Sequence, residues 1–97
     1  MIGMSISEFM DKIYHGDEIE FRIGDVTYFA QGNQKDSKFY LTVDYWKKTD
    51  GSEPPHDYLL SIECDSASER MQEFEKAKLF DGRTIYEAHN DITVLFG

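Results

Sequence analysis

The chain has 97 residues, of which 40% are hydrophobic, and this is enough for one domain with one core. It carries 19 acidic and 10 basic residues, and the resulting formal net charge of −9 repels phosphate backbones and anionic lipid. No apolar run approaches the ~20 residues of a membrane span. We therefore expect no nucleic-acid partner and no membrane association, whereas a basic protein partner is compatible with the charge.

The first third of the sequence predicts a helix followed by a hairpin. Residues 5–8, SISE, match a capping box, and apolar residues then recur at helical spacing, so we expect a helix over 6–15 that ends at Gly16. Alternating apolar residues in EIEFRI predict a strand, and Gly24-Asp25 predicts a two-residue turn into a second strand, VTYFA. We expect the polar stretch GNQKDSK to end that second strand.

The rest of the chain predicts two more strands, a second helix and a short last strand. KFYLTVDYWKK and YLLSIEC read as strands, and TDGSEPPH between them reads as a loop because its prolines cannot donate to a sheet ladder. Residues 66–69, SASE, match a second capping box and begin a helix with Phe74 on its core face. In ITVLFG, alternation predicts a strand with Ile92, Val94 and Phe96 on one face.

This order predicts a single α+β domain over residues 1–97. An N-terminal helix precedes a four-stranded antiparallel meander, and a C-terminal helix pair and the short last strand follow it. The helices are expected to cover one face of the sheet, and the sequence leaves open which face that is.

The stretch LFDGRTIYEAHND has the composition of a metal or phosphate loop, but backbone geometry accounts for most of it. Asp81-Gly82 allows the chain to reverse, and Thr84 with Glu87 forms a third capping pattern that begins a short helix. Arg83 is left without a local structural role. We therefore select Arg83 as a candidate binding residue.

A candidate binding surface lies along the third predicted strand. Tyr40, Asp44 and Trp46 alternate on one of its faces, and Phe29 of the second strand is expected beside them. Aromatic side chains beside acids are typical of a contact surface. The alternative is that this face packs under the second helix or the C-terminal segment.

Conventional catalytic and metal-binding patterns are not evident. Cys64 with a histidine would make a nucleophile pair, but Cys64 falls in the apolar register of the fourth strand, where a buried filler is expected. A single cysteine also excludes an intramolecular disulfide and a cysteine-based zinc cluster. His15, His56 and His89 lie in three separate segments. We expect no catalytic residues, no metal site, no cofactor and no enzymatic activity.

Two segments, EFMDKIYHGDEIEFRIGDVTYFA and LFDGRTIYEAHNDITV, resemble small uncharacterised proteins of Gram-positive bacteria and their phages. Those proteins have a short helix, a strand of the form hEIEF, where h is apolar, and a closing helix similar to DGKSLxEIWxxI. Ala88-His89 stands where that pattern has Ile-Trp. The resemblance covers both ends of the chain and implies a fold and a bacterial cytoplasmic location, but no particular activity.

Three functions are compatible with the sequence. The first is a non-catalytic protein-binding domain, such as an adaptor, a regulator or an immunity-type inhibitor, which could also bind a second copy of itself. The second is a small ligand binder or enzyme with a pocket among Tyr40, Asp44, Trp46 and His56. The third is acidic mimicry of a nucleic acid. Because the first residues, MIGMSISEFMDK, lack the basic start and apolar core of a signal peptide, we expect the protein in the cytoplasm.

Overall fold

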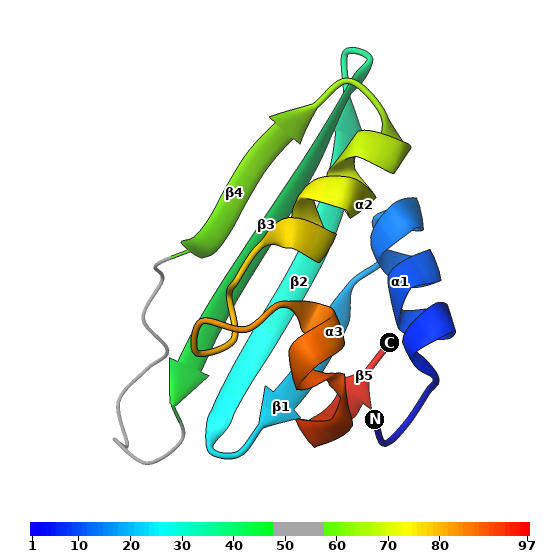
Figure 1. The fold of residues 1–97 in the computed structure, drawn as a ribbon. Helices are drawn as coiled ribbons and strands as arrows, with labels where there is room; N and C mark the ends of the chain where they lie inside the picture. Colours follow the sequence, from blue (N-terminus) through cyan, green and yellow to red (C-terminus); the bar gives the residue numbers. More distant parts are fainter. Residues whose placement is uncertain (48–57) are drawn as a thin grey trace.

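The computed structural model describes residues 1–47 and 58–97, and Figure 1 shows their arrangement. The predicted loop TDGSEPPH lies outside these residues. The predicted bounds of the first helix and the fourth strand are confirmed. The elements are α1 (Ile6–His15), β1 (Ile19–Ile23), β2 (Val26–Lys35), β3 (Lys38–Lys47), β4 (Tyr58–Cys64), α2 (Ala67–Lys76), α3 (Ile85–Ala88), a 3-10 turn η2 (His89–Asp91) and β5 (Ile92–Phe96).

The five strands form one antiparallel sheet in the order β4-β3-β2-β1-β5. Strands β1 to β4 form the predicted meander, and the α+β class is confirmed. Strand β5 joins the sheet by pairing with β1 on the side away from β2. The sequence pattern predicted β5 as a strand but did not predict its place in the sheet.

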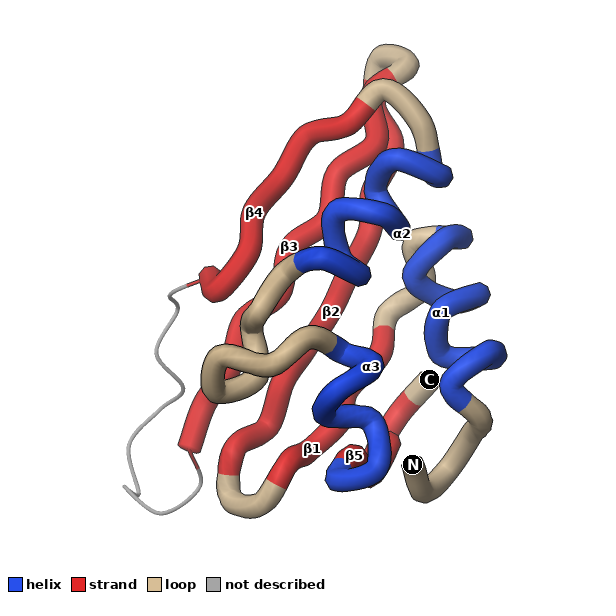
Figure 2. The backbone as a smooth tube through the Cα atoms, viewed as in Figure 1, coloured by secondary structure: helices blue, strands red, loops and turns tan. Residues whose placement is uncertain are grey.

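All three α-helices lie on one face of the sheet (Figures 1 and 2). Four phenylalanine rings between the two layers contact one another at centroid separations of 5.1 to 6.3 Å, in edge-on or tilted arrangements typical of aromatic cores. None of the described helices is long and apolar enough to cross a bilayer. The largest fully buried side chains are Phe9, Phe21, Phe74, Phe80, Ile13, Ile19, Leu41, Ile85, Ile92 and Val43.

The prediction that GNQKDSK ends the second strand is wrong. Strand β2 continues to Lys35 and β3 begins at Lys38, so only Asp36 and Ser37 form the turn. These two residues have φ angles of 53° and 66°, as the central residues of a type I′ hairpin turn require. The polar stretch can remain extended because its backbone pairs with β3 while most of its side chains face solvent.

Strand β5 forms within the predicted stretch ITVLFG, over Ile92–Phe96, but the expectation that Phe96 shares a face with Ile92 and Val94 is wrong. Ile92 is buried and Val94 packs against the core, whereas Phe96 is 59% exposed. The pairing of β1 with β5 shifts register between Glu20 and Phe21. Such a bulge reverses the alternation of the residues that follow it. Phe96 therefore lies opposite Glu20, on the face without helices.

Each α-helix begins at one of the predicted caps. Ser5, Ser66 and Thr84 accept a hydrogen bond from the backbone N–H three residues later, at 3.1, 3.1 and 3.4 Å. Only the third cap is a complete capping box, because Glu87 also accepts from the N–H of Thr84 at 3.0 Å. In α2, the carboxylate of Glu69 instead accepts from the backbone one residue before the cap.

Candidate protein-binding surface

The sheet face opposite the helices carries three of the predicted binding residues. In β3, Tyr40 and Asp44 alternate with Leu41 and Val43, which are buried beneath the helices. Phe29 of β2 lies directly opposite Asp44 and shares its face. The helices therefore cover the Leu41 face, and no described helix lies over the Tyr40 face, which answers the question that the sequence left open (Figure 2).

One row of side chains crosses this uncovered face from β5 to β4. Its directly opposite neighbours are Phe96 with Glu20, Glu20 with Phe29, Phe29 with Asp44, and Asp44 with Tyr58. Opposite residues point to the same face, and neighbouring strands lie about 4.8 Å apart. Three aromatic rings thus alternate with two carboxylates across all five strands. We call these five residues the aromatic–acidic row.

The aromatic–acidic row is open at its ends and more enclosed in its middle. Tyr58 and Phe96 are 60% and 59% exposed, whereas Glu20, Phe29 and Asp44 are half-buried. Oδ1 of Asp44 is buried and receives no hydrogen bond from any described residue. A buried polar oxygen without a donor is costly. The uncovered face therefore holds one carboxylate oxygen whose hydrogen-bonding capacity no described residue uses.

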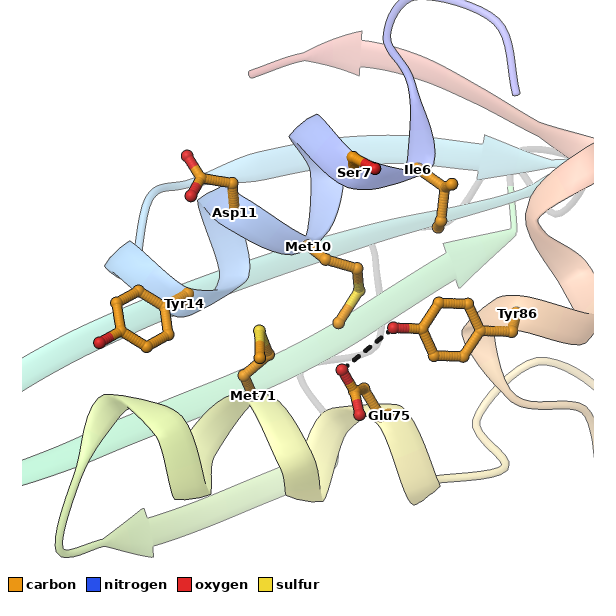
Figure 3. A pocket seen from close by; sticks show the side chains of 8 residues that line it. All are labelled: Ile6, Ser7, Met10, Asp11, Tyr14, Met71, Glu75 and Tyr86. Atoms are coloured by element: carbon orange, nitrogen blue, oxygen red, sulfur yellow. Dashed lines mark hydrogen bonds between the residues drawn. The ribbon is translucent and has the colours of Figure 1, made fainter.

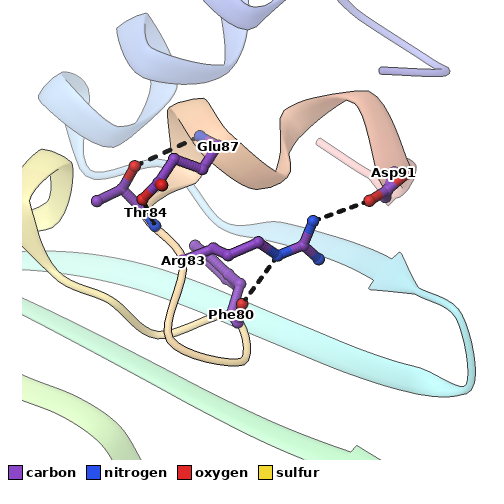
Figure 4. A network of polar contacts seen from close by, with 5 residues as sticks. All are labelled: Phe80, Arg83, Thr84, Glu87 and Asp91. Carbon is purple, nitrogen blue, oxygen red and sulfur yellow. Dashed lines mark hydrogen bonds and ion pairs between the residues drawn. The ribbon is translucent and has the colours of Figure 1, made fainter.

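The expectation that Arg83 lacks a local structural role is wrong. Phe80 and Arg83 exchange two backbone hydrogen bonds around Asp81-Gly82, whose φ angles of 57° and 76° close the turn. The Arg83 side chain donates from Nε to the Phe80 carbonyl at 3.3 Å and from a terminal nitrogen to the Asp91 carboxylate at 3.0 Å (Figure 4). These contacts account for Arg83 and remove the reason for selecting it as a binding residue.

A groove of about 500 Å³ lies between helices α1, α2 and α3 (Figure 3). Met10 and Met71 point toward each other across it, and the Tyr86 hydroxyl donates to the Glu75 carboxylate at 3.0 Å. Burial, together with this hydrogen bond, raises the pKa of Tyr86. None of the described residues that line the groove indicates a particular occupant.

Arg70, on α2, is a buried cation that was not among the residues predicted from the sequence. It is 2% exposed, and its guanidinium donates to the Tyr14 carbonyl at 2.6 Å and to the Asn33 and Tyr40 carbonyls at 3.3 and 3.4 Å. Burial lowers the pKa of Arg70. The Tyr14 carbonyl belongs to the last turn of α1, where the helix dipole favours a cation. Arg70 therefore joins α1 to the β2–β3 hairpin and has a structural role.

The predicted burial of Cys64 is confirmed. Burial raises the pKa of its thiol, and a protonated thiol is a weak nucleophile. Within residues 1–47 and 58–97, no three His, Cys, Asp or Glu side chains gather as a metal site. His56 and the side chain of Trp46 lie outside the part of the chain that the structure describes.

Comparison with protein-family models, with curated proteins and with solved structures found no match to this chain. The resemblance to small proteins of Gram-positive bacteria and their phages therefore stays a prediction. The fold itself defines an acidic α+β domain whose sheet is covered by helices on one face and crossed by the aromatic–acidic row on the other.

Proposed function

We propose that this chain is a non-catalytic protein-binding domain that contacts its partner through the uncovered sheet face. The aromatic–acidic row carries the proposal, because its three rings are exposed or half-buried where no described helix covers them. Large aromatic side chains supply much of the binding energy at protein interfaces. A domain of this kind would act as an adaptor, a regulator or an immunity-type inhibitor.

The charge of the chain supports a basic partner. Its formal net charge is −9, and the row places Glu20 and Asp44 between the rings. Complementary charge accelerates association and selects among partners, and its effect weakens as the salt concentration rises. We therefore propose a partner whose contact surface is basic, with an association rate that falls as salt is added.

The two other functions have less support. A ligand pocket among Tyr40, Asp44, Trp46 and His56 depends on side chains outside the described residues. A nucleic-acid mimic needs acids aligned like successive phosphates, whereas the row separates its two carboxylates with an aromatic ring. The burial and raised thiol pKa of Cys64 also disfavour a cysteine enzyme.

The test is affinity capture with matched surface variants. The purified chain, Phe29→Ser, Tyr58→Ser and the control Tyr86→Ser are immobilised separately and exposed to a lysate of the source organism. Tyr58 and Tyr86 are both exposed tyrosines, on the sheet face and in the helical groove respectively. Circular dichroism confirms that each variant is folded.

We expect the wild type and Tyr86→Ser to retain the same captured protein and both sheet-face variants to lose it. A partner that binds all four forms equally, or that is lost only with Tyr86→Ser, would contradict the use of the uncovered face. Size-exclusion chromatography of the same variants shows whether the partner is a second copy of the chain.

A further inference from the structure

We propose that the aromatic–acidic row binds the arginine side chains of a partner helix, at two guanidinium subsites. This inference rests on the proposed function, because it names the chemistry that the uncovered face recognises. The first subsite is Phe29, Asp44 and Tyr58, and the second is Phe96, Glu20 and Phe29. Each subsite consists of a carboxylate with an aromatic ring on either side.

This arrangement matches the edge and the flat face of a guanidinium group. Its edge carries N–H donors that pair with a carboxylate, and its flat face stacks on an aromatic ring. In the first subsite, the Asp44 carboxylate has a buried oxygen without a donor among the described residues. No described residue forms an ion pair with Asp44, so its carboxylate charge is available to an incoming guanidinium.

Lysine matches the row less well than arginine. Its ammonium is a compact and strongly hydrated charge, which can pair with Asp44 or Glu20 but cannot stack flat on the neighbouring rings. The rings would therefore contribute mainly to arginine binding. Two carboxylates on an open face without aromatic neighbours would show little preference between the two cations.

The spacing of the row predicts the spacing of the arginines. The Asp44 and Glu20 strands are two steps apart in the sheet, a separation of about 9.6 Å. Residues i and i+7 of an α-helix lie on one face and about 10.5 Å apart. Sheets bury their faces against helices, as the other face of this sheet does. The partner segment is therefore a helix with arginines at i and i+7.

Arg22 is a basic residue on the same face, and its positive charge lowers the affinity of the aromatic–acidic row for an arginine peptide. It lies two residues from Glu20 along β1, opposite Thr27 and Thr93 in the neighbouring strands. It makes no ion pair with a described residue at 4.0 Å or less. Its charge lowers the local negative potential beside the second subsite. Arg22→Gln should therefore strengthen the binding of an arginine peptide by about two- to threefold.

The experiment titrates the full chain with three alanine-based helical peptides of roughly 20 residues. The first carries arginine at i and i+7, the second carries lysine at the same positions, and the third carries arginine at i and i+5, which places the two side chains on different faces. Chemical-shift changes in NMR spectra give both the dissociation constant and the location. We expect the first peptide to bind about fivefold more tightly than either of the others. We also expect it to change the chemical shifts of the residues of the aromatic–acidic row.

Matched variants separate this recognition from general attraction to an acidic chain. Asp44→Asn and Tyr58→Leu should abolish the preference for arginine over lysine. The controls Glu75→Gln and Tyr86→Leu make comparable changes in the helical groove and should leave it unchanged. Glu20→Gln provides a second row variant if Asp44→Asn does not fold.

Equal affinity for the arginine and lysine peptides, or no binding of either, would overturn the inference. Equal loss of preference in the groove controls would do the same. Neither peptide result contradicts the proposed function if Phe29→Ser and Tyr58→Ser still lose the captured partner. If capture is unaffected by those variants, the proposed function fails as well.

Discussion

At the scale of single residues, two glycines allow the end of α1 to touch strand β2. The Gly32 amide donates to the Gly16 carbonyl at 3.2 Å, and a Cβ atom built on Gly32 would lie 2.4 Å from the Cα of Gly16. Such a separation is far below van der Waals contact, so only glycine fits at this position. The Arg70 guanidinium lies beside the same contact and leaves no room for a shift toward it.

Gly32→Ala should therefore lower the free energy of unfolding by about 1–3 kcal/mol, because the new methyl group forces α1 and β2 apart. Urea denaturation measures the change. The neighbouring variant Gln31→Ala is the control, because Gln31 is exposed and its removal should alter stability by no more than about 0.5 kcal/mol. Equal effects of the two substitutions would contradict the steric explanation.

At the scale of elements, short local motifs set the boundaries of the helices and of the hairpins. The capping patterns were predicted because an N-cap and its partner are only three residues apart. The β2–β3 turn was missed because Asp36-Ser37 is a weaker type I′ signal than Asn-Gly or Asp-Gly. The polar side chains around this turn are typical of a loop. The residues nevertheless form strands, because the backbones of β2 and β3 pair up to the turn itself.

The β2–β3 turn can be strengthened. Asp36→Asn combined with Ser37→Gly should raise the free energy of unfolding by about 1 kcal/mol, because both new residues tolerate positive φ angles better. Thermal denaturation gives the measurement. Ser37→Val supplies the opposite case, since a β-branched residue resists this conformation. A turn that responds alike to both changes would not be of type I′.

The capping box of α3 should make stability depend on acid pH. The backbone and side-chain hydrogen bonds of Thr84 lower the pKa of Glu87 below its ordinary value of 4.5. A lowered folded-state pKa adds stability above the unfolded-state pKa, and this stability is lost as the pH falls through the folded-state pKa.

Glu87→Gln should therefore lower the free energy of unfolding at pH 7 and lose less stability than the wild type as the pH falls below about 4.5. Urea denaturation at several pH values measures both effects. Glu63→Gln removes one exposed acid from β4 and controls for net charge. Parallel pH curves for the wild type and Glu87→Gln would count against the capping role.

At the scale of the whole molecule, the two faces of the sheet have different roles. Phe74 is fully buried between the helices and the sheet, whereas Tyr58 is 60% exposed on the other face. Burial of large apolar side chains supplies most of the stabilisation of a small domain. The helix-covered face therefore maintains the fold, and the other face, over which no described helix lies, is the one that we propose contacts a partner.

Phe74→Ala should lower the free energy of unfolding by about 3–5 kcal/mol, because it leaves a cavity in the core. Tyr58→Ala should change it by no more than about 0.5 kcal/mol, because its side chain faces solvent. Chemical denaturation of the two variants under the same conditions provides the comparison. A large cost for Tyr58→Ala would mean that this face is part of the core.

The site was only partly predictable from the sequence. Alternation along β3 placed Tyr40 and Asp44 on one face, since that period is a local property of a strand. Tyr58 and Phe96 were missed because their membership of the row depends on cross-strand register, which a bulge shifts in both the β3–β4 and the β1–β5 pairings. The burial of Arg70 could have been predicted, because Arg70 precedes Phe74 by four residues and therefore lies on the same buried face of α2.

The sequence by itself determined the α+β class, the caps of the helices and the alternation of the strands. All of these depend on interactions within a few residues of the chain. Only the tertiary structure decided which sheet face the helices cover, where β5 joins the sheet, and which side chains form the aromatic–acidic row. These features depend on contacts between residues far apart in sequence, and local periodicity carries no information about their partners.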